Sequence, residues 1–374
     1  MHEARGDYYG GTFHSPSGEA FSSHDPAREH RVVLTTAGDP ARAAAACEAA
    51  AAAWPAWSAR GLDERVAALG RLRAAIEARA DGLSEAITLE MGKLRAEARA
   101  EAAALVARCA LVGAGVRAEL TGGPVRGFDN EIVRYRPHGV VAVLGPFNFP
   151  LHLCHAYVVP ALLLGNTVVV KPSELTPLAG QRYAEAIDAA GLPPGVLNVV
   201  SGGGAVGAAL ARDPRVRGLA FTGSWPTGRR LLEATLDRPE LLLALEMGGK
   251  NMCVVREDAD LRQAVHEVVT SAYLSTGQRC TCADRVLVHA RLADRFVDAL
   301  RGVLAGLVFG DPEDPRSFAG PMASARAQAG FLEAIAAARA GGAEAIVEGG
   351  ARPGGAFVAP SLHRLARGVH DLDG

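Results

Sequence analysis

The chain has 374 residues, of which 49% are hydrophobic and 21% charged, so it is too long for one core and too apolar for a disordered or fibrous protein. Its 39 basic and 41 acidic residues nearly cancel, so neither nucleic acid nor a membrane surface is an expected partner. Six cysteines without paired metal spacing favour a reducing, cytoplasmic location and argue against a disulfide scaffold or a bound metal.

Residues 1–11 contain charges and tyrosines and no apolar segment, so no signal peptide is expected. Residues 1–38 are expected to form short strands and turns. Asp39 and Pro40 then provide a helix start, because an N-cap acceptor precedes a proline in the first turn. The following region is predicted to be helical over 41–53, 62–79, 83–91 and 95–112. A bridging strand segment is expected near residues 123–137.

From residue 131 short apolar runs alternate with helical stretches. Strands are predicted over 140–144, 168–171, 196–200, 218–222 and 241–245, and helices over 152–164, 177–190, 204–212 and 226–236. Continuous apolar strands separated by helices indicate a parallel sheet with helices on both faces. The apolar run 151–170 contains His152, Pro160 and Gly165, so it predicts a helix followed by a strand and not a membrane span.

Beyond Glu246 the alternation continues. A helix is predicted near 259–275, a strand near 285–289, and helices near 291–307 and 322–341. We therefore expect two α/β domains, residues 1–245 and 246–374.

A nucleophile is best sought at Cys280, because Arg279 adjoins it and a neighbouring cation favours the thiolate. Cys282 is a rival that the sequence separates from Cys280 only weakly. Buried thiols are usually inert, and the remaining ones are assigned to the packing of helices and strands: Cys47, Cys109, Cys154 and Cys253.

Glu246 is a lone carboxylate before a glycine-rich turn, and it is the candidate general base. A thiol and a separate base are what chemistry through a covalent acyl intermediate requires. Asn148, in the loop Pro146-Phe147-Asn148-Phe149-Pro150, can donate to an oxyanion, although an Asn in such a loop more often satisfies only its own turn.

Candidate dinucleotide contacts follow three predicted strands. Gly202, Gly204 and Gly207 satisfy G-x-G-x-x-G, but the acidic residue of the usual fingerprint is missing from 218–230, so a simple glycine turn is the stronger interpretation of this motif alone.

Lys171-Pro172-Ser173-Glu174 ends the strand 168–171, where ligands of open α/β sheets bind, although a plain surface turn fits equally well. A carboxylate there would accept from ribose hydroxyls and repel a 2′-phosphate, so Glu174 favours NAD over NADP. Phe221-Thr222-Gly223-Ser224 leads into a helix whose start can bind a pyrophosphate or simply be capped by Ser224.

These segments occur together and in this order in the aldehyde dehydrogenase superfamily, which the chain resembles from about residue 15 to its end. The resemblance is carried by Phe147-Asn148-Phe149-Pro150, Gly165-Asn166-Thr167, Lys171-Pro172-Ser173-Glu174, Phe221-Thr222-Gly223-Ser224, Leu245-Glu246-Met247-Gly248-Gly249-Lys250 and Gly277-Gln278-Arg279-Cys280-Thr281. Within the family, the amino-acid sequence of residues 136–140, 246–249 and 277–282 is most similar to that of members that oxidise N-succinylglutamate 5-semialdehyde in arginine catabolism.

The resemblance implies a Rossmann-type NAD-binding domain that does without the usual fingerprint, followed by an α/β catalytic domain. It implies that Cys280 forms a thiohemiacetal and then a thioester, and that Asn148 and the Cys280 N–H hold the oxyanion. Glu246 would activate the water that hydrolyses the thioester.

The same resemblance implies the cofactor contacts. Lys171 and Glu174 match contacts to the adenosine ribose, Ser224 matches a pyrophosphate contact, and Gly207 matches a glycine near the adenine. We add the residues that flank these positions: Pro146, Phe147, Ser173, Phe221 and Gly223.

The chain ends before the Glu-x-Phe-Gly-Pro segment of the family, so we expect roughly a fifth to a quarter of a typical member to be absent. Such a fragment is expected to show little activity alone and to aggregate. A homo-oligomer is expected for full-length relatives and is not predicted for this chain. Three alternatives stay open: another aliphatic aldehyde, transfer of the acyl group to coenzyme A, and a non-catalytic product that binds NAD.

Overall fold

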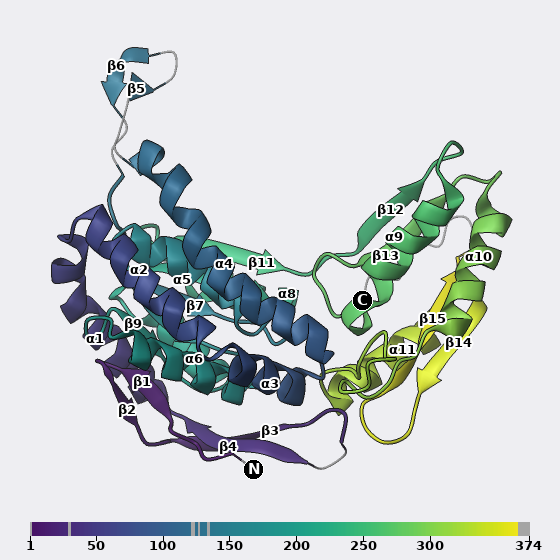
Figure 1. Cartoon of the computed structure of the whole chain (residues 1–374), viewed down its shortest axis with the longest axis horizontal. Coiled ribbons are helices and arrows are strands. Elements are labelled where there is room, and N and C mark those ends of the chain that lie inside the picture. The colour runs from purple at the N-terminus through teal and green to yellow at the C-terminus, as the bar shows by residue number, and fades with distance from the viewer. Residues whose placement is uncertain (1, 29–30, 121–123, 126–127, 133–134, 366–374) are drawn as a thin grey trace. The chain divides into compact units, whose positions relative to one another are not determined.

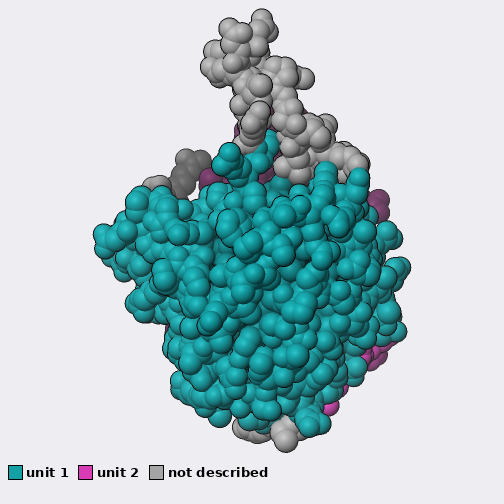
Figure 2. Space-filling view, turned by 90° about the vertical axis from the view of Figure 1, so that its left-hand side faces the viewer, with its two compact units in different colours: residues 1–23, 32–87, 98–247 teal, residues 24–31, 88–97, 248–374 magenta. Residues whose placement is uncertain are grey.

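The computed structural model describes residues 2–365 except 29–30, 121–123, 126–127 and 133–134. By its internal contacts the chain divides into two compact units (Figure 2). The first contains Met1–Ser23, Val32–Ile87 and Ala98–Met247, and the second contains His24–Arg31, Thr88–Glu97 and Gly248–Gly374. Two short N-terminal segments thus group with the second unit, an arrangement that no sequence pattern indicates.

A seven-stranded sheet forms the centre of the first unit (Figure 1). Its order is β11 (Leu242–Met247), β10 (Val216–Gly223), β7 (Val140–Leu144), β8 (Thr167–Lys171), β9 (Leu197–Val199), β1 (Asp7–Tyr9) and β2 (Thr12–His14). The strands from β11 to β9 are parallel, and the edge strands β1 and β2 are antiparallel. The predicted parallel sheet is confirmed, and an antiparallel N-terminal hairpin extends it.

Helices lie on both faces of this sheet. Those of the first unit are α1 (Pro40–Ser58), α2 (Leu62–Glu77), α5 (His152–Leu163), α6 (Pro177–Ala190), α7 (Gly204–Arg212) and α8 (Trp225–Ala234), joined by most of α3 (Ala80–Met91) and α4 (Arg95–Leu120). α1 contacts α7, and α2 contacts α5 and α6. Small residues of α1, such as Ala43 and Ala46, are fully buried against β7, which lets the helix approach the sheet closely. No described helix is both long and apolar enough to cross a membrane.

The strand order indicates where a ligand is expected to bind in the first unit. From β7 the chain proceeds outward through β8 and β9, then returns to the other side of β7 to form β10 and β11. The direction therefore reverses between β7 and β10. Open α/β sheets bind ligands outside the carboxyl ends of the strands at such a reversal.

Two small sheets are separate from the central sheet. β3 (Glu19–His24) pairs with β4 (Val32–Gly38), and β5 (Pro124–Val125) pairs with β6 (Phe128–Ile132). The second pair lies within the predicted bridging segment.

The second unit contains α9 (Leu261–Tyr273), the 3₁₀ turn η1 (Leu274–Gly277), α10 (Ala293–Gly306) and α11 (Ala325–Ala340). β12 (Asn251–Val255) pairs in parallel with β13 (Ala283–Val288), and β14 (Glu344–Ala351) pairs antiparallel with β15 (Val358–Arg364). Val265 and Val268 of α9 pack with Phe296 and Leu300 of α10 in its core. The predicted helices and β13 are confirmed, whereas β12, β14 and β15 were not predicted. β14 and β15 are half-exposed and carry glycines and Pro360, which weaken the strand signal.

Candidate functional site

Backbone register aligns several predicted residues along one edge of the central sheet. Lys171 of β8 pairs with Leu144 of β7, and Leu144 pairs with Phe221 of β10. Phe221 in turn lies opposite Leu245 of β11, one residue before Glu246. Because these strands are parallel, the whole row lies at their carboxyl ends, the edge at which open sheets bind ligands.

Lys171 is a buried cation held by backbone carbonyls. Its Nζ donates to the carbonyl oxygens of Pro172 at 2.6 Å and Gly202 at 2.9 Å, and lies 3.6 Å from Glu174 Oε2. Burial lowers the pKa of Lys171, and the nearby Glu174 carboxylate opposes that shift. The predicted Lys171–Glu174 pair is therefore assembled at the end of β8, where the ammonium has a fixed direction.

The glycine motif needs glycine at its first position. Gly202 has φ +143°, and a Cβ there would lie 2.3 Å from Val206 Cγ2. At Gly207 a Cβ would make only ordinary contacts, 3.8 Å from Lys171 Cε. Gly202 thus shapes the turn whose carbonyl receives Lys171, and Gly207 leaves room beside the same side chain.

Ser224 is the N-cap residue of α8, but its side chain makes no capping hydrogen bond. Its hydroxyl donates instead to Thr227 Oγ1 at 3.1 Å. At Gly223 a Cβ would lie 2.5 Å from the Phe221 ring, so only glycine fits before the helix. Capping by the Ser224 side chain is therefore not observed, and pyrophosphate binding at this helix start stays a prediction.

Asn148 lies in the loop after β7, between the buried Pro146 and Pro150. Its Oδ1 accepts a hydrogen bond from the Phe149 N–H at 3.0 Å. This bond orients the amide, so that the Nδ2 donor points away from the Phe149 N–H. The side chain thus satisfies its own turn with its oxygen, and the role of Asn148 as an oxyanion donor stays a prediction.

Glu246 lies near the end of β11, opposite Thr222 of β10, with an exposed carboxylate. Successive side chains of a strand point to opposite faces. Leu245 and Met247 pack against the hydrophobic core beneath α1 and α7, so Glu246 points to the other face. An exposed carboxylate at this position can contact water directly, as a hydrolytic base must.

Cys280 belongs to the second unit, in the loop between η1 and β13, and is half-buried. Asn251 holds this loop, because its Nδ2 donates to the carbonyl oxygens of Cys280 at 2.7 Å and Cys282 at 3.0 Å. Burial raises the pKa of the Cys282 thiol, which disfavours the thiolate at the rival position.

The cysteines assigned to packing include three whose burial suppresses reactivity. Burial raises the pKa of Cys47 and Cys154 to about 12 and that of Cys109 to about 11. Thiols with such pKa values form little thiolate near neutral pH.

Arg279 was singled out only as a cation beside Cys280, and the structure gives it specific partners. Its Nη2 lies 3.1 Å from Glu97 Oε1, and its Nε donates to Ser275 Oγ at 3.0 Å. Ser275 Oγ itself donates to Glu97. Glu97, Ser275 and Asn251 are residues that sequence reasoning missed. The partner of Arg279 is 182 positions away in sequence, so only the fold reveals it.

The predicted residues thus gather in two groups. Asn148, Lys171, Glu174 and Glu246 lie in the first unit, and Cys280 lies in the second. Among the described residues no three His, Cys, Asp or Glu side chains are grouped as metal ligands would be.

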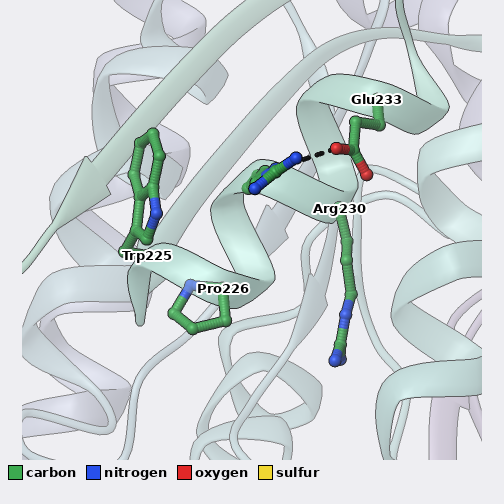
Figure 3. A pocket seen from close by; sticks show the side chains of 5 residues that line it. Trp225, Pro226, Arg230 and Glu233 are labelled. Atoms are coloured by element: carbon green, nitrogen blue, oxygen red, sulfur yellow. Dashed lines mark hydrogen bonds and ion pairs between the residues drawn. The ribbon is translucent and has the colours of Figure 1, made fainter. Parts of the chain in front are cut away.

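A shallow pocket lies on α8, lined by Trp225, Pro226, Arg229, Arg230 and Glu233 (Figure 3). Two of the lining residues form an ion pair, with Arg229 Nε 2.9 Å from Glu233 Oε1. None of the predicted catalytic or cofactor residues lines it.

Comparison with known proteins places these features in one family. The profile described as "Aldehyde dehydrogenase family" matches residues 13–367. The chain is 41% identical over 370 residues to N-succinylglutamate 5-semialdehyde dehydrogenase of Caulobacter sp. (strain K31), which covers 96% of this chain and 74% of that relative.

Two solved structures show the same fold. A mutant of aldehyde dehydrogenase C from Pseudomonas syringae, complexed with NAD⁺ and octanal, superposes with a TM-score of 0.91 at 30% identity, covering 96% of this chain and 75% of the other. An NADP-dependent enzyme of E. coli gives a TM-score of 0.90 at 33% identity, covering 96% and 76%. These likenesses confirm the predicted fold.

Proposed function

Because the chain belongs to the aldehyde dehydrogenase family, we propose that it encodes the NAD-dependent oxidation of N-succinylglutamate 5-semialdehyde to N-succinylglutamate. The observation that supports this choice of substrate is the 41% identity over 370 residues with the N-succinylglutamate 5-semialdehyde dehydrogenase of Caulobacter sp. (strain K31). The reaction class has a broader basis, since the family profile spans residues 13–367 and includes every predicted site residue.

The thiol chemistry is proposed for Cys280. Its Sγ attacks the aldehyde carbon, the carbonyl oxygen becomes an oxyanion, and a thiohemiacetal forms. Asn148 Nδ2 and the Cys280 backbone N–H donate to that oxygen. The raised pKa of Cys282 supports the choice between the two thiols.

Glu246 is proposed as the base of the second half of the reaction. Its carboxylate takes a proton from water, the resulting hydroxide attacks the thioester carbon, and the C–S bond breaks to release the acid and the Cys280 thiolate. The exposure of Glu246 supports this role, because the base must meet a water molecule after the first product has formed.

The residues at the carboxyl edge of the sheet fit a dinucleotide. Lys171 and Glu174 supply a donor and an acceptor 3.6 Å apart for ribose hydroxyls, and the start of α8 at Ser224 supplies backbone N–H groups for the pyrophosphate. We assign Gly207 and Phe221 to the same site. A bound NAD would supply a hydride acceptor here, and loss of hydride from the thiohemiacetal carbon would leave a thioester on Cys280.

Glu174 is expected to set the preference for NAD over NADP. Its carboxylate beside Lys171 repels a 2′-phosphate, so Glu174→Gln is expected to shift the ratio of kcat/KM values for NADP and NAD by about tenfold toward NADP. The two cofactors are compared at saturating aldehyde, with Glu233→Gln as the control for removal of an exposed carboxylate. An unchanged ratio in Glu174→Gln would remove Glu174 from the cofactor site.

The substrate is tested by comparing acidic and neutral aldehydes. We expect kcat/KM for N-succinylglutamate 5-semialdehyde to exceed that for short aliphatic aldehydes by about 10²-fold, because a site that binds carboxylates leaves its polar groups unpaired with a neutral aldehyde. Equal values would favour another aliphatic aldehyde as the natural substrate while leaving the reaction class intact.

The setting of this reaction is proposed to be the cytoplasm, because six unpaired cysteines suit a reducing compartment. The substrate is a small molecule, and the near-neutral charge gives no reason to expect nucleic acid as a partner.

A further inference from the structure

The turn before Cys280 has an unusual backbone. Ser275 and Thr276 have φ of 55° and 57°, and Gly277 has φ 68°. Only glycine adopts this left-handed conformation readily, and for a β-branched residue such as Thr276 it is a rare and strained state. Such strain persists only where surrounding contacts enforce it, and it concentrates at functional sites.

Side chains enforce the turn from several directions. Thr276 Oγ1 donates to the Gly320 carbonyl at 2.7 Å, and Gln278 Nε2 donates to the Ser275 carbonyl at 3.2 Å. Gln278 Oε1 accepts from the Ala323 N–H at 2.9 Å. These contacts bind the turn to the segment that precedes α11.

The remaining contacts converge on Glu97. Its Oε1 accepts from both Ser275 and Arg279, and Arg279 donates in turn to Ser275, so three side chains form a closed triangle. The side chains of Arg279 and Glu97 are only 25% and 13% exposed. Removing one partner of a partly buried ion pair is costly, because it leaves a desolvated charge without its partner.

We propose that Glu97 and Arg279 are positioning residues for Cys280, joined through Ser275 into a strut that holds the nucleophile loop in its left-handed turn. The inference rests on the proposed role of Cys280 as the nucleophile. Glu97 belongs to the start of α4, so a residue far upstream in sequence fixes the backbone beside the thiol.

This role differs from that of a cation acting on the thiol. If Arg279 acted only by its charge, neutralising Glu97 would leave the guanidinium uncompensated and Cys280 at least as reactive. If the pair is a strut, Glu97→Gln and Arg279→Gln must impair the same step together. The two variants therefore separate the interpretations by the sign of the Glu97→Gln effect.

The experiment measures two quantities on the whole chain. The first is the rate and KM of the pre-steady-state NADH burst with N-succinylglutamate 5-semialdehyde. The second is hydrogen exchange of the 278–282 amides, among which Gln278 N–H and Cys282 N–H are bonded within the loop. Glu313→Gln is the matched control, since Glu313 pairs with Arg95 at 2.8 Å beside the same end of α4 and no described contact joins it to the loop.

We expect Glu97→Gln and Arg279→Gln each to slow the burst by about 10- to 100-fold with KM changed less than about threefold, because a small displacement of a reacting group is costly. Exchange of the loop amides should rise by about tenfold or more, and Glu313→Gln should match wild type in both readouts. The double variant should be no slower than the worse single one, because both substitutions remove the same interaction. Arg279→Lys, which keeps the charge, should recover part of the burst rate.

Faster exchange with an unchanged burst rate would reduce the strut to a structural contact and overturn the inference. So would unchanged exchange, or a burst in Glu97→Gln as fast as in wild type. Failure of the proposed function is distinguishable, because it would appear as turnover that survives Cys280→Ala.

Discussion

Replacement of Cys280 by alanine is expected to abolish NADH formation, lowering kcat by about 10⁴-fold or more, because no other group on the chain is proposed to form the covalent intermediate. Incubation with aldehyde and NAD should leave the mass of the Cys280→Ala chain unchanged, whereas wild type should carry an acyl adduct. Absorbance of NADH and intact-mass spectrometry check the two expectations.

Cys282→Ala is the matched control for this experiment. It removes a thiol two positions away that shares the Asn251 anchor, and burial raises the pKa of that thiol. We expect Cys282→Ala to keep the adduct and most of the activity. An adduct that survives in Cys280→Ala and disappears in Cys282→Ala would reverse the assignment of the nucleophile.

Glu246→Gln is expected to separate the two halves of the reaction. The amide cannot take a proton from water, so hydrolysis of the thioester should slow by about 10²- to 10⁴-fold. The first NADH should still form in a burst stoichiometric with enzyme, because Glu246 has no proposed part in thiohemiacetal formation or hydride loss. Stopped-flow absorbance of NADH followed by the steady-state rate measures both phases.

Glu233→Gln serves as the control for this second experiment. Glu233 is an exposed carboxylate of α8, paired with Arg229, and lies outside the proposed machinery. We expect its burst and its steady state to match wild type. If Glu246→Gln lost the burst as well as the steady-state rate, Glu246 would be needed for acylation. The proposal that it acts only in hydrolysis of the thioester would then be wrong.

The architecture of the first unit was predictable because its strands are continuously apolar and its helices are separated by clear turns. The helices α6 and α7 begin and end at the predicted residues, and so does β7. Each of these elements carries its own local signal, such as Pro177 at the start of α6 and Gly191 just after its end.

Other features had no local signal. The ion pair between Arg279 and Glu97 joins residues 182 positions apart, and the left-handed turn at Ser275 and Thr276 contradicts the preference of both residues. Long-range contacts override local preference at such places, and sequence reasoning is expected to fail at strained sites. The residues proposed to carry the chemistry were therefore found as motifs, whereas the residues that hold the Cys280 loop were not.

The edge of the central sheet has a consequence for synthesis of the chain. Tyr8 of β1 pairs with Val199 of β9, so this strand is synthesised well before its partner. At about 5–20 residues per second, the N-terminal strand must wait roughly 10–40 s for its partner to be made. During that interval the hairpin of β1 and β2 exists without the sheet that it will border, and two-stranded hairpins are marginally stable in water. This edge of the sheet therefore forms only after its own strand has waited for β9 to be made.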